Sequence, residues 1–302
     1  MFDVIIVGGG AAGLSAALVL GRARREVLLC GEGAPRNVPS PHAHSFFSRD
    51  GMAPLALLQI GREQLAPYRS VTYRPQAVVA AVRDAAGFTV VLGDGTREAA
   101  RRLLLATGVV DELPAIPGLA ERWGISVLHC PYCHGWEVRD QPLAVLGNDA
   151  LAVEQALLIS QWSRDLVLCT NGPATFTEDD QHRLRRRGIT IHEGHITQVD
   201  GVNGTLAHIQ FTDGAPLARQ ALFIRAVQHQ RSPLAAQLGC QLTSPFPGTE
   251  LITVDGTGAT TIPGVFAAGD ATTMLQQVVA AAASGALAAA MLNRDVLLDD
   301  LA

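Results

Sequence analysis

The sequence predicts an α/β protein in which strand–loop–helix units build two parallel-sheet domains. Two such units lead to this prediction, one beginning at Val4 and the other at Pro142, about one domain length further on. A third strand ends in a turn at Gly269 and leads into a long alanine-rich helix. Proline- and glycine-rich stretches near 111–118 and 244–250 are the expected domain boundaries.

The first unit begins with Val4–Val7, a continuous apolar run typical of a parallel strand buried on both faces. Gly8–Gly13 forms a glycine loop, an Ala/Leu-rich helix follows to about Leu20, and Val27–Cys30 predicts the next strand. Further strands are expected at 78–82, 88–92 and 103–106, with a turn at 93–96. The second unit predicts a strand at 142–147, a helix at 150–161 and a strand at 165–169.

The composition is that of an ordinary globular protein. Of the 302 residues, 48% are hydrophobic and 17% are charged, and the net charge of −5 gives no reason to expect nucleic acid. The N-terminus has no basic leader and the apolar stretch 274–292 is too weakly hydrophobic to predict a membrane span, so we expect a cytoplasmic protein. The five cysteines make no disulfide framework, and Cys30 and Cys169 end apolar runs as buried strand residues do.

Gly8, Gly10 and Gly13 form the pattern Gly-x-Gly-x-x-Gly between a predicted strand and a predicted helix. Glycine allows the tight turn, lets the backbone approach a pyrophosphate and lets the helix pack on the strand, while the helix N-terminus stabilises the phosphates. In this context the pattern predicts a dinucleotide site. Glu32 is the only acid at the end of the second strand and is the candidate ribose-binding residue, although it lies slightly late.

Cys130-Pro131-Tyr132-Cys133 predicts a redox-active dithiol, because a Cys-x-x-Cys pair in a cytosolic protein has lowered thiol pKa values. Cys-x-x-Cys-His is also a haem attachment motif, but nothing suggests export. A zinc site would need a second Cys/His pair at suitable spacing, so no metal is predicted. Glutaredoxins share the tetrapeptide, but there it follows the first strand of a small domain.

With the N-terminal loop, Thr107-Gly108 and Gly269-Asp270 complete a pattern that resembles the FAD-binding domain of the low-molecular-weight thioredoxin reductase family. The resemblance implies two Rossmann-like domains: an FAD domain of residues 1–112 and 247–302, and an inserted, degenerate NAD(P)H-type domain of residues 113–246. It also implies that Gly269 and Asp270 meet the ribitol chain and that the helix beginning at Gln277-Val278 directs its positive end at the flavin. The usual Arg before Gln-Val is Gln276 here.

The same resemblance implies that Cys133 exchanges electrons with FAD and that Cys130 meets the substrate. His134 stands where the family has an acidic aspartate, and His129 precedes Cys130. Two imidazoles beside a dithiol suit proton removal from thiols near neutral pH, although either histidine could equally be structural.

Pro35-Arg36-Asn37, followed by His42 and His44, resembles more narrowly the dithiol oxidases of the gliotoxin and holomycin type. This resemblance makes Asn37 and His129 the candidate pair near the sulfurs and the flavin. A turn residue that caps local backbone is an equal alternative for Asn37.

The second glycine loop departs from the Gly-x-Gly-x-x-Gly pattern. It reads Gly147-Asn148-Asp149, so a carboxylate stands where a pyrophosphate would approach, and no arginine follows the next strand at 169–173. We therefore expect an FAD-dependent dithiol oxidase that uses oxygen, needs no NADPH and acts on a small dithiol or a thioredoxin-like protein. The family resemblance implies a homodimer. The alternatives are a reductase fed by ferredoxin, another flavin or, less so, NADPH, and a non-catalytic redox sensor.

Overall fold

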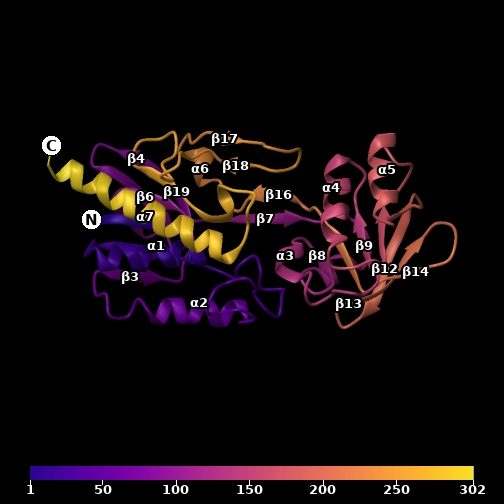
Figure 1. Ribbon diagram of the computed structural model, residues 1–302. Coiled ribbons are helices and arrows are strands. Elements are labelled where there is room, and N and C mark those ends of the chain that lie inside the picture. Colours follow the sequence, from indigo (N-terminus) through magenta and orange to yellow (C-terminus); the bar gives the residue numbers. More distant parts are fainter. Residues whose placement is uncertain (302) are drawn as a thin grey trace. The chain divides into compact units, whose positions relative to one another are not determined.

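The computed structural model describes residues 1–301, which divide into two compact units (Figure 1). Unit 1 comprises Met1–Arg36, Ser45–Asp111 and the chain from Gln228 onward, and unit 2 comprises Asn37–His44 and Glu112–Val227. Residues 228–246, expected in the inserted domain, thus cluster with unit 1, and Asn37–His44 cluster with unit 2. The nucleotide assignment of the two domains stays a prediction.

A seven-stranded sheet forms the centre of unit 1. Its order is β3-β2-β1-β6-β5-β4, and β19 pairs with β6. Strands β1, β2, β3, β6 and β19 are mutually parallel, whereas β4 and β5 are antiparallel. The bounds are β1 Phe2–Val7, β2 Val27–Cys30, β3 Val71–Arg74, β4 Val78–Asp84, β5 Gly87–Leu92, β6 Arg97–Leu105 and β19 Val265–Ala267. The predicted apolar runs form this core because both faces of the sheet are covered.

Helices α1 (Ala11–Arg22) and α7 (Val278–Asp300) lie side by side on one face of this sheet (Figure 1). Their backbones approach closely, since a Cβ on Gly285 would lie 2.1 Å from the Ala12 carbonyl oxygen. Small residues on both helices make this approach possible. The smaller elements of unit 1 are α2 Pro54–Glu63, α6 Leu234–Gln237, β17 Leu242–Thr243, β18 Leu251–Ile252 and the 3₁₀ turn η2 Gly269–Ala271.

Unit 2 is built on a five-stranded parallel sheet of order β11-β10-β9-β15-β8. An antiparallel sheet, β12-β13-β14, packs against it through a shared apolar cluster. Its elements are η1 Ala120–Arg122, β8 Val127–Leu128, α3 Pro131–His134, β9 Leu143–Leu146, α4 Ala150–Ile159, β10 Leu166–Cys169, α5 Glu178–Arg186, β11 Thr190–His192, β12 Ile196–Val202, β13 Thr205–Phe211, β14 Leu217–Ala218 and β15 Ala221–Ile224.

The chain passes between the units in β7 (Val109–Glu112) and β16 (Val227–Gln230), which pair with each other. Cys30 and Cys169 are buried, as predicted, and so is Cys240. Among residues 1–301, no helix combines the length and the apolar character that a membrane span needs.

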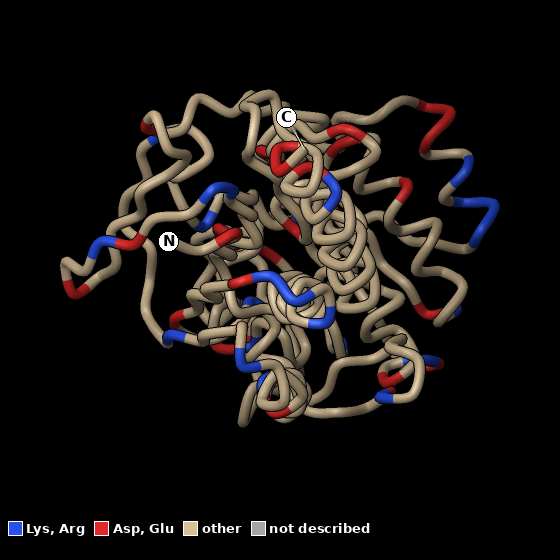
Figure 2. Tube along the Cα trace, turned by 90° about the vertical axis from the view of Figure 1, so that its left-hand side faces the viewer, with Lys and Arg blue, Asp and Glu red and all other residues tan. Residues whose placement is uncertain are grey.

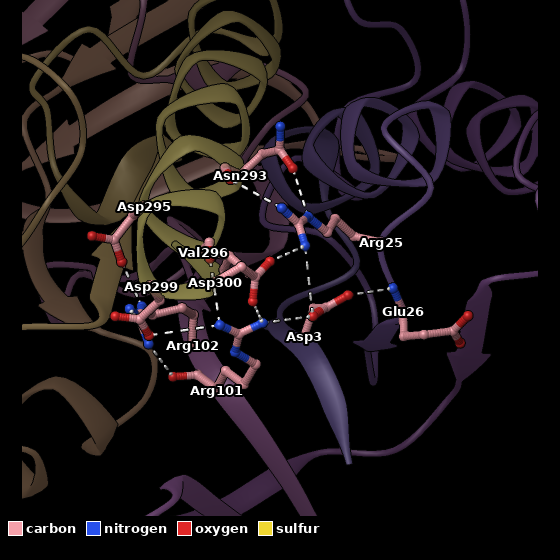
Figure 3. Close-up of polar contacts among 10 residues, drawn as sticks. All are labelled: Asp3, Arg25, Glu26, Arg101, Arg102, Asn293, Asp295, Val296, Asp299 and Asp300. Atoms are coloured by element: carbon pink, nitrogen blue, oxygen red, sulfur yellow. Dashed lines mark hydrogen bonds and ion pairs between the residues drawn. The ribbon is translucent and has the colours of Figure 1, made fainter. Parts of the chain in front are cut away.

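The C-terminal end of α7 carries an unfavourable cluster of acids. Charged residues of this helix gather in its last turns (Figure 2). Asp299 and Asp300 lie in the last turn, where the helix dipole is negative, so their carboxylates are repelled by the nearby backbone carbonyls, and Asp295 lies one turn earlier. Three arginines of the rest of unit 1 offset this repulsion, and Figure 3 shows their contacts: Arg25, Arg101 and Arg102.

Arg102 makes the most direct of these contacts. Its guanidinium binds Asp295 through Nε and lies 2.7 Å from Asp299 through Nη2. Arg101 reaches Asp300 at 2.7 Å, and Arg25 donates to the Asn293 side chain at 2.7 Å. The arginines thereby fix the end of α7 against β6 and the loop before β2.

Replacing Arg102 with Ala should lower the free energy of unfolding by about 1 kcal/mol, because two acids would remain at the negative end of α7. The thermal midpoint should fall by about 2–4 °C, and added salt should shrink the difference from wild type. Arg185→Ala is the matched control, since the Arg185 side chain is exposed on α5 and donates to the Gln181 side chain of the same helix. Equal shifts for both variants would contradict the proposed role of these ion pairs.

Candidate active site

The first glycine loop joins β1 to α1 and leaves the start of that helix open. Gly8 has φ +120°, and a Cβ there would lie 2.1 Å from the Ala106 carbonyl oxygen. A Cβ on Gly13 would lie 1.8 Å from the Gly8 oxygen, so both positions require glycine. Gly10 is the N-cap of α1 without a side-chain cap, and a Cβ there would meet open space. The amide groups of the first turn therefore remain available to a phosphate.

The other predicted cofactor residues of unit 1 follow neighbouring strands. Thr107 and Gly108 follow β6, and Gly269 and Asp270 follow β19. Because β1, β6 and β19 are parallel and adjacent, their carboxyl ends meet at one edge of the sheet. The exposed residue Glu32 lies just beyond β2, on the far side of β1 from β6.

Helix α7 begins at the same part of unit 1. Gln277 is its N-cap and makes no side-chain cap hydrogen bond, and Val278 is its first residue. The first-turn amide groups of α7, like those of α1, thus have no side-chain partner. Two uncapped helix starts beside the ends of three parallel strands fit a dinucleotide, with the phosphates at α1 and a developing negative charge near α7.

The dithiol lies at the start of α3 in unit 2. Cys130 is the N-cap of this helix, Cys133 is within it, and the two form a disulfide with Cα atoms 5.3 Å apart. The ring of Tyr132 packs edge-on against Trp162, with centroids 5.6 Å apart. Gly135 permits this packing, because a Cβ there would lie 2.8 Å from the Trp162 indole nitrogen. The residues after α4 therefore fix the dithiol turn.

His134 lies in the same short helix, directly after Cys133. Burial lowers the pKa of its imidazole, the Glu137 carboxylate raises it, and a charge on His44 lowers it. The net direction is downward, so the imidazole is neutral at pH 7 and can accept a proton. Glu137 also pairs with His44, the two side chains lying 3.4 Å apart. Sequence reasoning did not find this pair, because His44 and Glu137 are far apart along the chain.

His129 and Asn37 belong to unit 2 as well. The His129 carbonyl oxygen accepts a hydrogen bond from Gln155 of α4 at 3.4 Å. The Asn37 carbonyl oxygen accepts one from the Ser40 amide at 3.0 Å, so this residue does begin a turn. A catalytic or flavin-binding role for either residue stays a prediction.

The second glycine-type loop, between β9 and α4, differs from the first at the helix N-cap. Asp149 is the N-cap of α4, as Gly10 is of α1, and its carboxylate accepts a hydrogen bond from the Ala152 amide at 2.7 Å. The carboxylate also lies 3.7 Å from the guanidinium of Arg225. An internal acceptor thus occupies an amide group that a nucleotide phosphate would need.

The loop after β10 is hydrogen-bonded to Asn148, which directly precedes the N-cap of α4. The side-chain oxygen of Asn148 accepts from the Thr175 amide at 2.8 Å, and its side-chain nitrogen donates to the Pro173 carbonyl at 2.8 Å. The Thr175 hydroxyl donates to the Asn148 carbonyl oxygen at 2.6 Å. The loop is therefore bonded to the chain's own backbone. Among residues 1–301, no His, Cys, Asp and Glu side chains gather in a group that could hold a metal ion.

Comparison with known proteins decides the family. A model of the pyridine nucleotide-disulphide oxidoreductases matches residues 2–285. The chain belongs to this family.

Two solved structures share its fold and much of its sequence. The crystal structure of HlmI is 42% identical, with a TM-score of 0.93 over 99% of this chain and 93% of its own. The oxidoreductase from Agrobacterium tumefaciens is 37% identical, with a TM-score of 0.93 over 98% of this chain and 99% of its own. Thioredoxin reductase sirT of Leptosphaeria maculans is 31% identical over 100% of this chain and 96% of its own. The resemblance to thioredoxin reductases is confirmed: the protein is an FAD-dependent disulfide oxidoreductase with a two-domain Rossmann-like fold.

Asp149→Ala should lower the free energy of unfolding by about 1 kcal/mol, because α4 loses its N-cap acceptor. Asp149→Gly should cost only a few tenths of that amount, and Asp149→Asn should be close to wild type, since Asn also caps well. Thermal midpoints of the three variants test this order. If Asp149→Asn were as unstable as Asp149→Ala, the contact with Arg225 and not the cap would account for the loss.

Proposed function

We propose that the protein is an FAD-dependent thiol oxidase that closes a disulfide in a small dithiol, with oxygen as the electron acceptor and without NADPH. The observation that supports this most strongly is the Asp149 carboxylate at the N-cap of α4. An oxidase needs a bound flavin and a dithiol but no nicotinamide. The contrast between the two glycine-type loops matches that requirement.

A nicotinamide nucleotide would meet two obstacles in unit 2. Its pyrophosphate would have to displace the bond between Asp149 and the Ala152 amide, and it would then lie beside a carboxylate. Arg225 is the cation at this position and already faces Asp149. The loop 170–175, where NADPH enzymes of this family carry arginines, has none and is bonded to Asn148. The unit is thus a scaffold that presents the dithiol.

The dithiol and His134 provide the first half of the reaction. A substrate thiolate attacks Cys130 Sγ, the Cys130–Cys133 bond breaks, and Cys133 leaves as a thiolate. The second substrate thiol then attacks the mixed disulfide, so the substrate loses two protons and two electrons and the enzyme dithiol gains them. His134 accepts the proton of the incoming thiol as a neutral imidazole. Bound FAD would supply the two-electron acceptor that restores the Cys130–Cys133 disulfide, and oxygen, on taking up those two electrons and two protons, would become hydrogen peroxide.

The surroundings of the dithiol within unit 2 favour a small apolar substrate. Tyr132 is 57% exposed and Trp136 is 66% exposed, and both lie within four residues of a cysteine. The guanidinium of Arg139 lies 3.9 Å from the Trp136 ring centre and holds that ring from one side. Exposed aromatic surface is costly in water unless a ligand covers it. The narrower resemblance to the gliotoxin- and holomycin-type oxidases agrees with a small dithiol substrate.

On the family resemblance we also propose that the protein is a homodimer and that it is cytoplasmic.

His134→Gln should lower turnover with a dithiol by about 10²- to 10⁴-fold, because no base then takes the thiol proton. In the wild type the activity should fall only below about pH 6.5, since burial lowers the pKa of this imidazole from its ordinary 6.5. The variant should lack this acidic limb. His182→Gln, on exposed α5, is the control and should keep the wild-type pH profile. An unchanged acidic limb in His134→Gln would assign the base elsewhere.

The proposed function is tested by adding NADPH or a dithiol to the oxidised protein without air and following the visible flavin absorbance. Dithiol alone should bleach the flavin, and air should restore the colour with formation of hydrogen peroxide. Cys130→Ser should show neither effect while still binding FAD. Rapid bleaching by NADPH would refute the argument from Asp149. Bleaching by neither reagent would favour a reductase that receives electrons from ferredoxin or another flavin.

A further inference from the structure

Five polar side chains of unit 1 form one hydrogen-bonded group, which we call the Arg36 cluster: Arg36, Asp111, Gln228, Asp270 and Gln276. Arg36 is its centre. Its Nε and Nη2 each lie 2.6 Å from an oxygen of Asp111, and its Nη1 donates to Asp270 at 3.2 Å and to Gln276 at 2.5 Å. A planar guanidinium suits this arrangement because it directs several donors at fixed angles.

Gln228 completes the cluster. The side-chain amides of Gln228 and Gln276 exchange two hydrogen bonds, at 2.9 and 2.8 Å, and Gln228 is 2% exposed. Gln228 also donates to Asp111 at 3.4 Å. The side chain of Asp111 is only 5% exposed, so its charge depends on Arg36 for compensation.

The cluster members occupy particular places in the chain. Arg36 and Asp111 are each the last residue of a segment of unit 1, and Gln228 is the first residue of another. Asp270 lies in η2, and Gln276 directly precedes the N-cap of α7. The Arg36 guanidinium therefore joins Asp111 to Asp270 and Gln276 directly, and Gln228 is joined to this group through Gln276 and Asp111.

We propose that Arg36 is a positioning residue for FAD, which holds Asp270 and the start of α7 in place and couples them to these three points of the chain. The proposal rests on FAD binding by the family and not on the oxidase reaction, so the nature of the electron acceptor does not affect it.

The cluster also explains why the chain has Gln276 where thioredoxin reductases have arginine. The Gln276 side-chain oxygen accepts from Arg36 at 2.5 Å, so an arginine at 276 would place a second cation against the first. Position 36 already supplies the positive charge, and a neutral amide is the partner that can accept from Arg36 and still bond Gln228.

Arg36 also opposes protonation of Asp270, whose carboxyl has a pKa above its ordinary value. Burial raises the pKa of the Asp270 carboxyl, the Arg36 guanidinium lowers it, and the Asp111 carboxylate raises it. Without Arg36, burial and Asp111 would raise the pKa of Asp270 unopposed. Asp270 would then bind a proton at a higher pH than in the wild type. A protonated Asp270 would accept hydrogen bonds from the ribitol hydroxyls less well.

The test is titration of the FAD-free protein with FAD, followed by flavin fluorescence from about pH 5 to about pH 8. Arg36→Met should raise the Kd for FAD by about tenfold or more, with a larger rise at the acidic end. Arg231→Met is the matched control. The Arg231 side chain donates a hydrogen bond to the Ala34 carbonyl oxygen at 3.1 Å, and Ala34 is not a member of the Arg36 cluster. Equal effects in both variants, or a pH-independent Kd in Arg36→Met, would overturn the proposal.

A second set of three variants covers the case in which Arg36→Met does not fold. Gln276→Arg should weaken FAD binding by placing two cations together, and Gln276→Met should weaken it less because it only removes hydrogen bonds. Combining Gln276→Arg with Arg36→Gln restores a single cation and should recover part of the affinity. Wild-type affinity in Gln276→Arg would contradict the charge argument.

Discussion

The amide groups at the start of a helix need an acceptor, and this constraint distinguishes the two halves of the molecule. In unit 1 the chain places Gly10 at the N-cap of α1, so these groups are left for a phosphate. In unit 2 it places Asp149 at the corresponding position, and the carboxylate satisfies one of them internally. The residue type at this one turn position thus determines whether the start of the helix is left open or is capped by the chain itself.

The close packing in unit 1 follows from the same loop. Gly8 and Gly13 allow the strand, the turn and α1 to approach within distances that no Cβ permits. Gly285 does the same for α7 against α1. The two helices can therefore share one face of the sheet, with their uncapped ends at the part of unit 1 where the parallel strands end. Packing and cofactor binding are consequences of the same small side chains.

Much of this arrangement could be predicted from local sequence. The strand of β1, the glycine loop and the altered loop at Asp149 are contiguous patterns with a period or a spacing of their own. The entry of the chain into unit 1 at Gln228 could not be predicted, and the proline-rich stretch 244–250 was the expected boundary instead. That stretch lies within unit 1, where the Gly248 carbonyl accepts from the Gln228 amide at 2.7 Å.

The Arg36 cluster could not be predicted for a related reason. Its members come from three separate segments of unit 1, and none carries a periodic signal that ties it to another. Even the replacement of arginine by Gln276, visible in the sequence, has no meaning until Arg36 is seen to lie against it. Buried charges of this kind are specified by their partners, and partners are a property of the fold.

If unit 2 binds no nucleotide, as we propose, then no ligand contributes to its free energy of folding, and its own contacts must stabilise it. Asp149 caps α4, and Asn148 bonds the loop after β10 to the loop after β9, so both loops are stabilised by the chain's own hydrogen bonds. The parallel sheet beneath keeps a continuous apolar core. The dithiol turn rests on the residues that follow α4, through Trp162. The cap on α4 therefore also supports the dithiol turn that the proposed reaction uses.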